Sequence, residues 1–311
     1  MQIGARISAP DGCILRWGGY GLVYLRRILP LSLTVFMAVL AAAALHAGWN
    51  AVVKLRVEPL LGIVLINGGC AVLGLVVLLF SGFPAREAWG WLVLSGVVHL
   101  LYGLALAEAY RVGDMGFVYP IARGAAPMMT LVGSLIFVGD PLPPLAIAGI
   151  VVLGFGIALM AFSRASAVDG RALLFALLTA CTITLYTMAD GLGARASGNP
   201  HAYAAAMFVL DGGLLLIYAL VTRGVDWLKQ ARPVLIPGMA GGAMGFVAYW
   251  IVIWAMTEAP IALVAALRES SILFATLIAI FVLKEKALPL RVAAALFIVA
   301  GIALMRTATF I

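Results

Sequence analysis

The chain has 311 residues, of which 65% are hydrophobic and 11% charged, with a mean hydropathy of +1.14 and a formal net charge of +7. About a quarter of the residues of a soluble domain are charged, so this composition excludes a water-soluble globular protein. The basic residues are scattered singly or in pairs between apolar runs, a pattern typical of contact with anionic lipid headgroups rather than with nucleic acid.

Ten apolar runs are long enough to cross a bilayer, which requires about 20 mostly apolar residues per helix. They lack the alternation of a membrane β-barrel, so we expect an all-α membrane protein. Residues 1–30 hold Arg6, Arg16, Arg26 and Arg27 and are expected to form a flexible or interfacial N-terminal tail. The expected spans are residues 31–53, 58–80, 88–109, 115–138, 143–163, 172–190, 202–222, 234–256, 260–283 and 288–305.

The cysteines give no disulfide pattern and no CxxC motif. Cys70 and Cys181 lie inside apolar runs and are expected to be small packing residues. We expect no cofactor and no metal ion.

An internal repeat relates the two halves of the chain, because residues 104–160 align with residues 249–305 without a gap. Chance matches of Ala and Leu are frequent in an apolar sequence, but matched intramembrane arginines and loop acids in one register are not. The matched segments are Gly156–Met160 with Gly301–Met305, Arg123 with Arg268, and Asp140 with Glu285.

Each half then holds five spans, and an odd number reverses the second half in the membrane. We therefore expect two inverted five-helix repeats, over residues 31–163 and 170–306. This architecture recurs among secondary transporters, whose substrate site lies near the midplane between the repeats.

Four short motifs are characteristic: His46-Ala-Gly-Trp49-Asn50 followed by Lys54, Val118-Tyr119-Pro120-Ile-Ala-Arg123-Gly124, Ala266-Leu-Arg268-Glu269-Ser-Ser271, and Leu283-Lys-Glu285. With them the chain resembles, over about residues 31–306, the drug/metabolite transporter superfamily and its ten-helix EamA-type members. One departure is Asp140, where the family more often has Glu. The resemblance implies a secondary carrier, often an exporter of small metabolites.

Arg123 and Arg268 are the strongest candidates for substrate binding. A mid-membrane arginine costs roughly 2.5–3.5 kcal/mol to insert, so it normally faces a cavity or a partner. Each lies eight residues into its expected helix, about 12 Å below the surface that the helix enters. Inversion then places the guanidiniums about 6 Å apart along the membrane normal. Alternatively, each arginine pairs with an acid and only holds helices together; the available acids are Glu108, Asp190, Asp211 and Glu269.

Other polar and aromatic residues are candidates for the wall of the same site, although hydrogen bonding or packing between helices would also explain them. Asp211 and Glu269 could carry a coupling proton or pair with an arginine, and the Glu269 side chain is expected to point about 100° away from Arg268. The further substrate-binding candidates are His46, Trp49, Asn50, Tyr102, Tyr119, Tyr186, Asp190 and Trp250.

The expected span 234–256 carries two overlapping GxxxG spacings, from Gly238 to Gly242 and from Gly241 to Gly245. They predict close helix packing, either in a homodimer or within one chain.

The function that these features favour is secondary transport, with an exporter of a small polar or zwitterionic metabolite, such as an amino acid, as the first candidate. A flippase for a lipid-linked headgroup is the alternative. A membrane-embedded enzyme is less favoured, because HExxH, GxSxG, GxGD and phosphate-binding motifs are missing, and no nucleotide-binding domain supports ATP-driven pumping. We expect a multi-pass protein of the cell inner membrane, monomeric or homodimeric, in contact with lipids and a small-molecule solute.

Overall fold

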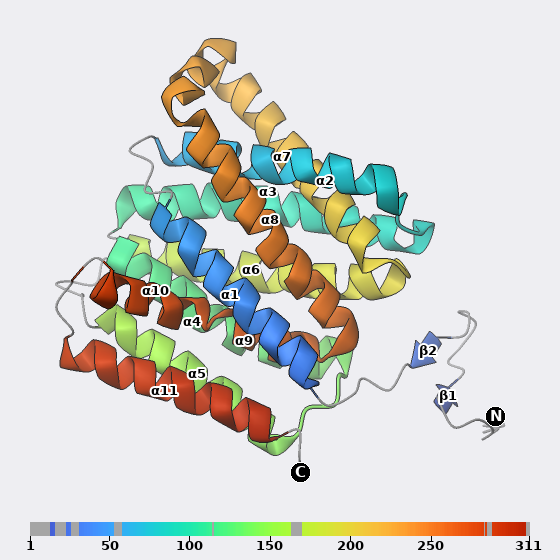
Figure 1. The fold of residues 1–311 in the computed structure, drawn as a ribbon, viewed down its shortest axis with the longest axis vertical. Coiled ribbons are helices and arrows are strands. Elements are labelled where there is room, and N and C mark those ends of the chain that lie inside the picture. Colours follow the sequence, from blue (N-terminus) through green and yellow to red (C-terminus); the bar gives the residue numbers. More distant parts are fainter. Residues whose placement is uncertain are drawn as a thin grey trace.

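Long apolar helices make up almost all of the computed structural model (Figure 1). The structure describes residues 13–15, 23–25, 31–52, 58–113, 115–162, 170–282, 284 and 288–308, with side chains from residue 31 onward except at 49–52, 59, 115–117 and 161–162. Helices dominate because hydrocarbon offers no partner to a backbone N–H or C=O group, so each group must be satisfied within its own segment.

The elements follow one another in this order. The first half contains β1 (Cys13–Leu15), β2 (Val23–Leu25), α1 (Leu33–Val52), α2 (Pro59–Ser81), η1 (Arg86–Ala88), α3 (Trp89–Val112), α4 (Met115–Gly133), η2 (Ser134–Val138) and α5 (Pro144–Phe162). The second half contains α6 (Gly170–Ala196), α7 (Pro200–Arg223), η3 (Val225–Val234), α8 (Leu235–Glu258), α9 (Ile261–Arg268), α10 (Ser271–Phe281) and α11 (Pro289–Thr307).

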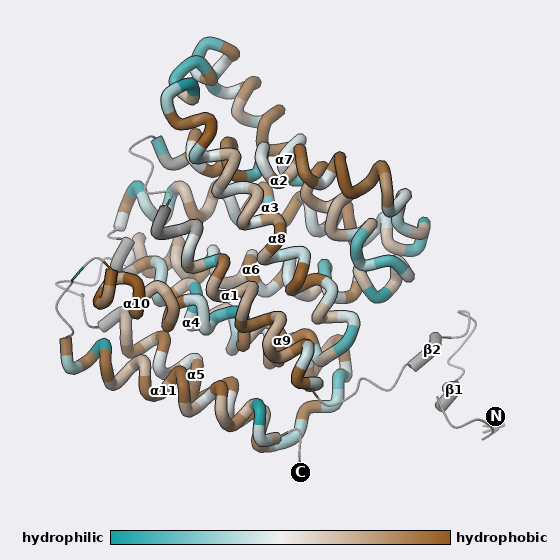
Figure 2. The backbone as a smooth tube through the Cα atoms, viewed as in Figure 1, coloured by the Kyte–Doolittle hydropathy of each residue, from teal (hydrophilic) through white to brown (hydrophobic). Residues whose placement is uncertain are grey.

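Eight of the described helical segments are long and apolar enough to cross a membrane, and two shorter apolar helices, Leu33–Gly48 and Pro144–Met160, accompany them. Figure 2 shows apolar residues along most of each helix and many of the hydrophilic residues near helix ends. Large apolar side chains face outward, as at Phe80 and Ile236, which are 87% and 82% exposed. The all-α membrane protein is thus confirmed, while the count of ten spans stays a prediction.

Two expected helices differ from the structure. The expected span 260–283 is divided, because α9 ends at Arg268 and α10 begins at Ser271. Between them the N–H groups of Glu269 and Ser270 bond to carbonyls three residues earlier, which tightens the backbone into a turn. The expected span 115–138 ends in a π-helical turn, η2. Within the expected tail, β1 pairs antiparallel with β2, which the sequence analysis did not predict.

Helix starts follow local sequence signals. Proline occupies the first helical position of α2, α7 and α11, where its missing N–H is not needed. Asn199 caps α7, since its side chain accepts bonds from the N–H groups of His201 and Ala202. These signals fix where the chain turns at the membrane surface.

The packing of α5 and α11 is reciprocal. α11 begins and ends 145 residues after α5, the same shift that aligned the repeat. Gly149 touches Gly301, whereas Gly156, the counterpart of Gly301, touches Ala294, the counterpart of Gly149. Likewise, α3 packs on α6 while their counterparts α8 and α1 pack on each other. Two copies related by a two-fold axis produce this reciprocity, and we propose the two inverted repeats over residues 31–163 and 170–306 on that basis.

The glycines of α8 pack within the chain, against α2. A Cβ on Gly242 would collide with the carbonyl oxygen of Ile66 and lie 2.8 Å from Cα of Gly69, so the two backbones touch. This contact accounts for one of the two GxxxG spacings without a dimer.

We expect Gly242→Val to destabilise the protein by about 1–3 kcal/mol or more, because neither backbone can yield to the added atoms. Gly213→Ala is the matched control, since a Cβ there meets open space. It should leave the melting temperature of the purified protein in detergent unchanged or slightly raised. Equal melting temperatures for Gly242→Val and the wild type would contradict the contact.

Candidate functional site

A cavity of about 140 Å³ is lined by residues of eight helices, α1 to α4 and α6 to α9. A single water needs about 10–15 Å³, so the cavity has room for on the order of ten waters or one small solute. Its polar lining consists of His46, Asn67, Cys70, His99, Tyr102, Arg123, Tyr186, Asp211, Tyr249 and Arg268. The rest of its lining is Ala42, Ile66, Phe208, Gly245, Ala248 and Val252.

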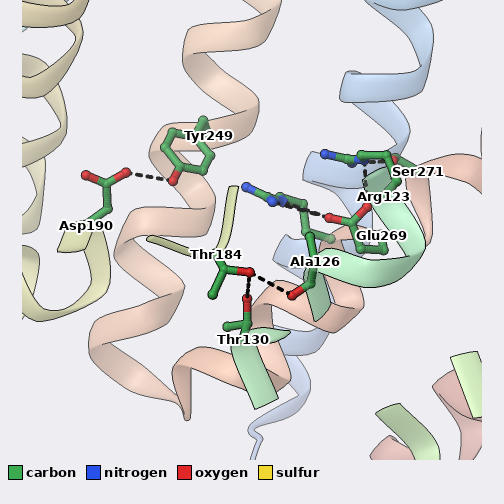
Figure 3. Close-up of polar contacts among 9 residues, drawn as sticks. Arg123, Ala126, Thr130, Thr184, Asp190, Tyr249, Glu269 and Ser271 are labelled. Atoms are coloured by element: carbon green, nitrogen blue, oxygen red, sulfur yellow. Dashed lines mark hydrogen bonds and ion pairs between the residues drawn. The ribbon is translucent and has the colours of Figure 1, made fainter. Parts of the chain in front are cut away.

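Two arginines, Arg123 and Arg268, share the carboxylate of Glu269 beside this cavity. Figure 3 shows Arg123 between Glu269 and Ser271. Oε2 of Glu269 lies 2.6 Å from Nε of Arg123, and its Oε1 lies 3.3 Å from Nη2 of Arg268. All three side chains are at most 6% exposed. One acid and two bases leave a net charge of +1 in this buried cluster, which favours an anionic group of a solute.

The two arginines are held differently. Arg123 also donates to Oγ of Ser271 at 3.1 Å, and its guanidinium lies 5.7 Å from the ring centre of Tyr119. Arg268 reaches Glu269 only at 3.3 and 3.4 Å, longer than the 2.7–2.9 Å of a strong charge-assisted bond. Arg268 is therefore the arginine whose donors are more available to a solute.

Aromatic rings flank Arg268 inside the cavity. Its guanidinium carbon lies 6.0 Å from the ring centre of Tyr186 and 5.5 Å from that of Tyr249. Tyr102 meets Tyr186 edge to face at 5.4 Å. Such faces attract cations and orient the guanidinium without using its N–H donors.

The contact between Glu269 and Arg268 corrects an expectation. On a continuous helix the Glu269 side chain would point about 100° away from its neighbour. Because α9 ends at Arg268, the turn that follows brings the carboxylate back to both arginines. The predicted alternative, in which the arginines pair with a nearby acid, is thus realised with a single acid.

Asp190 lies behind the cavity rather than in its lining. It is fully buried and accepts hydrogen bonds from Ser95 at 2.5 Å, Tyr249 at 2.7 Å and Tyr203 at 3.3 Å. Nε2 of His99 lies 4.0 Å from Oδ2 of Asp190, the oxygen that accepts from Tyr249. Figure 3 shows Tyr249 pointing at Asp190. The carboxylate is thus occupied by protein donors, and it orients Tyr249, which flanks Arg268.

His99 is a cavity residue that the sequence analysis missed. Its ring stacks on Tyr186, with centres 4.1 Å apart. Ser95, His99 and Tyr102 recur at helical spacing in the apolar middle of α3, so the sequence indicated a polar face there. Phe208, Asn67 and Cys70 were also missed as lining residues. Asn67 is a polar residue inside an expected span and carried the same signal, whereas Phe and Cys are ordinary in apolar helices.

Asp211 is the acid that faces the cavity itself. It is 5% exposed, and within the described part of the chain its carboxylate has no hydrogen bond or ion pair. Cys70, expected only to pack, lines the same cavity and donates to the carbonyl of Gly242 at 3.1 Å.

The other predicted residues are distributed as follows. In α1, His46 lines the cavity, and the side chains of Trp49 and Asn50 lie outside the described residues. Tyr119 contacts Arg123 without lining the cavity. Trp250 lies outside the lining, because its indole N–H bonds to His201 at 2.9 Å. In the described chain no group of three or more His, Cys, Asp or Glu side chains could hold a metal ion.

Comparison with known proteins adds two findings. Residues 170–307 match the model of the EamA-like transporter family. A solved crystal structure aligns over 87% of this chain and 94% of its own chain, with a TM-score of 0.69 and 16% sequence identity. That likeness shows a shared fold and nothing more. No curated protein matches the chain.

Proposed function

We propose that this chain is a membrane transporter and that it exports a small zwitterionic metabolite such as an amino acid. Residues 170–307 match the model of the EamA-like transporter family, which supports the first part. Transport would be secondary, by alternating access to the cavity between two inverted repeats in the cell inner membrane. The observation that carries this proposal is that one cavity is lined by a buried, loosely paired arginine and by an acid, Asp211, whose carboxylate has no hydrogen bond or ion pair to a described residue.

The charges of the cavity support a zwitterion. A substrate carboxylate fits the donors of Arg268, since planar guanidinium groups bind carboxylates through two parallel bonds. A substrate ammonium fits Asp211 and the faces of Tyr102 and Tyr249, which stabilise a cation. His46 and Tyr186 complete the proposed binding residues.

The two acids proposed for proton coupling differ in their surroundings. Glu269 is occupied by two arginines, so a proton there would release both of them. Asp211 faces the cavity, and its carboxylate has no hydrogen bond to a described residue. We therefore assign a coupling proton, if transport is proton-driven, to Asp211 rather than to Glu269.

A ligand screen tests the proposed substrate class. We expect at least one of the standard amino acids to raise the melting temperature of the purified protein. At 100 times its Kd, binding should add about 2.7 kcal/mol to the free energy of unfolding. The same amino acid should exchange in proteoliposome counterflow. If no amino acid stabilises the protein or exchanges, the substrate class is wrong.

A further inference from the structure

A polar cluster closes the end of the bundle where α6 ends and α9 begins. Arg195 binds the carboxylate of Asp140 through two parallel bonds, of 2.7 and 2.9 Å. Arg195 also donates to the carbonyls of Met256 at 2.8 Å and Ala259 at 3.1 Å. Asp140 in turn accepts the N–H of Ile261 at 2.9 Å. This ion pair with its backbone contacts is named the Asp140–Arg195 cluster.

The cluster ties together three segments that are distant in the sequence. Asp140 lies between η2 and α5, in the first half of the chain. Arg195 lies in the last turn of α6, and its backbone partners lie at the junction of α8 and α9. Movement of the first half relative to the second at this end must break the bonds of Asp140 to Arg195 and to Ile261, which are the bonds of the cluster that join the two halves.

The cluster stands directly beyond one end of the cavity. Along α6, the lining residue Tyr186 lies nine residues before Arg195, or about 13.5 Å. Along α8, the lining residue Val252 lies one turn before Met256, whose carbonyl Arg195 holds. Met207, Ile253 and Met256 are fully buried. Apolar packing and the cluster together close this end.

We propose that the Asp140–Arg195 cluster is a gate, closed in this structure, that must open for the cavity to reach one side of the membrane. This inference rests on the proposed transport function, and it assigns a role to residues outside the cavity. The bonds suit a reversible closure, because water can replace each of them once the helices part. The side chain of Arg195 is already 22% exposed, whereas that of Arg268 is 6% exposed.

Labelling of a cavity thiol tests the gate without any substrate. The reporter is Ala248→Cys, at a cavity-lining position, in a chain with Cys13→Ser, Cys70→Ala and Cys181→Ser. A membrane-impermeant maleimide is applied to spheroplasts and to inverted vesicles, which expose opposite faces. His201→Cys, at an exposed position in the first turn of α7, six residues after Arg195, shows which of the two preparations exposes the face on the gate side.

We expect Arg195→Gln to raise the labelling rate from the gate side at least about tenfold, since it favours the open state at that end. Asp140→Asn should also raise this rate, while its amide oxygen still accepts the N–H of Ile261. It serves as the second test if Arg195→Gln does not fold. Arg111→Gln, which breaks the exposed pair of Arg111 with Glu108, is the matched control and should change nothing.

The outcomes separate the gate from the transport proposal. If the reporter is labelled but both gate variants leave the gate-side rate unchanged, the gate is overturned and the transport proposal stands. If the reporter is labelled from neither side in any variant, the cavity is not a transport path and both proposals fall.

Discussion

Arg268→Gln is expected to lower proteoliposome counterflow of the transported amino acid by about 10- to 100-fold. The substitution removes the charged, loosely paired donor that lines the cavity. A hydrogen bond to a charged group contributes about 1.5–3 kcal/mol. Losing it weakens the binding of the amino acid by about 10- to 100-fold, and counterflow should fall accordingly. The protein should still fold, because Arg123 and Glu269 remain as a 2.6 Å ion pair of zero net charge.

Two further variants sharpen this prediction. Arg268→Lys keeps the charge but lacks the planar fork, so it should retain part of the transport. Trp250→Phe changes a predicted site residue that lies outside the cavity, and it should transport like the wild type. Wild-type counterflow by Arg268→Gln, with normal size-exclusion behaviour, would show that the arginine does not bind the solute.

The largest loss of stability is expected for Glu269→Gln. Glu269 is the acid that both buried arginines contact, and it is 1% exposed. Breaking a buried ion pair by removing one partner costs about 3–5 kcal/mol, because the remaining charge stays in a medium that solvates it poorly. Here two guanidiniums would remain, and they would also repel each other.

Thermal unfolding in detergent measures this effect. Glu108→Gln is the matched control, because Glu108 forms an i,i+3 pair with Arg111, whose side chain is 68% exposed. Water screens that pair, so its loss should leave the melting temperature unchanged. If Glu269→Gln has the same melting temperature as the wild type, the carboxylate of Glu269 is not needed to stabilise the two buried arginines.

Part of the candidate site was readable from the sequence. Arg123 and Arg268 stand out because a charge inside an apolar run is costly, and the repeat matches them to each other. Tyr102, Tyr186 and His46 were also found, as polar positions within spans, and they line the cavity. Trp250 was chosen by the same reasoning but bonds to His201 instead. A polar residue in a span needs a partner, and the sequence does not say which.

The Asp140–Arg195 cluster is a second case in which the sequence did not predict the partner of a charged residue. Asp140 is one of the two loop acids that the repeat matches, and its carboxylate accepts the N–H of Ile261, the first residue of α9. Its pairing with Arg195, 55 residues away, was not predicted. A basic residue at a helix end is equally consistent with lipid headgroups, so no local pattern distinguishes the two roles.

The sequence alone determined the membrane helices, the shift of 145 residues between α5 and α11, and the two arginines in corresponding positions. These follow from local composition and spacing, since lipid forces each apolar segment into a helix whatever its neighbours are. Only the tertiary structure decided which acid neutralises which base, that Arg268 has the freer donors, and that Asp140 meets Arg195. Those choices depend on distances of a few ångströms between segments far apart in the chain, which the packing of the helices sets.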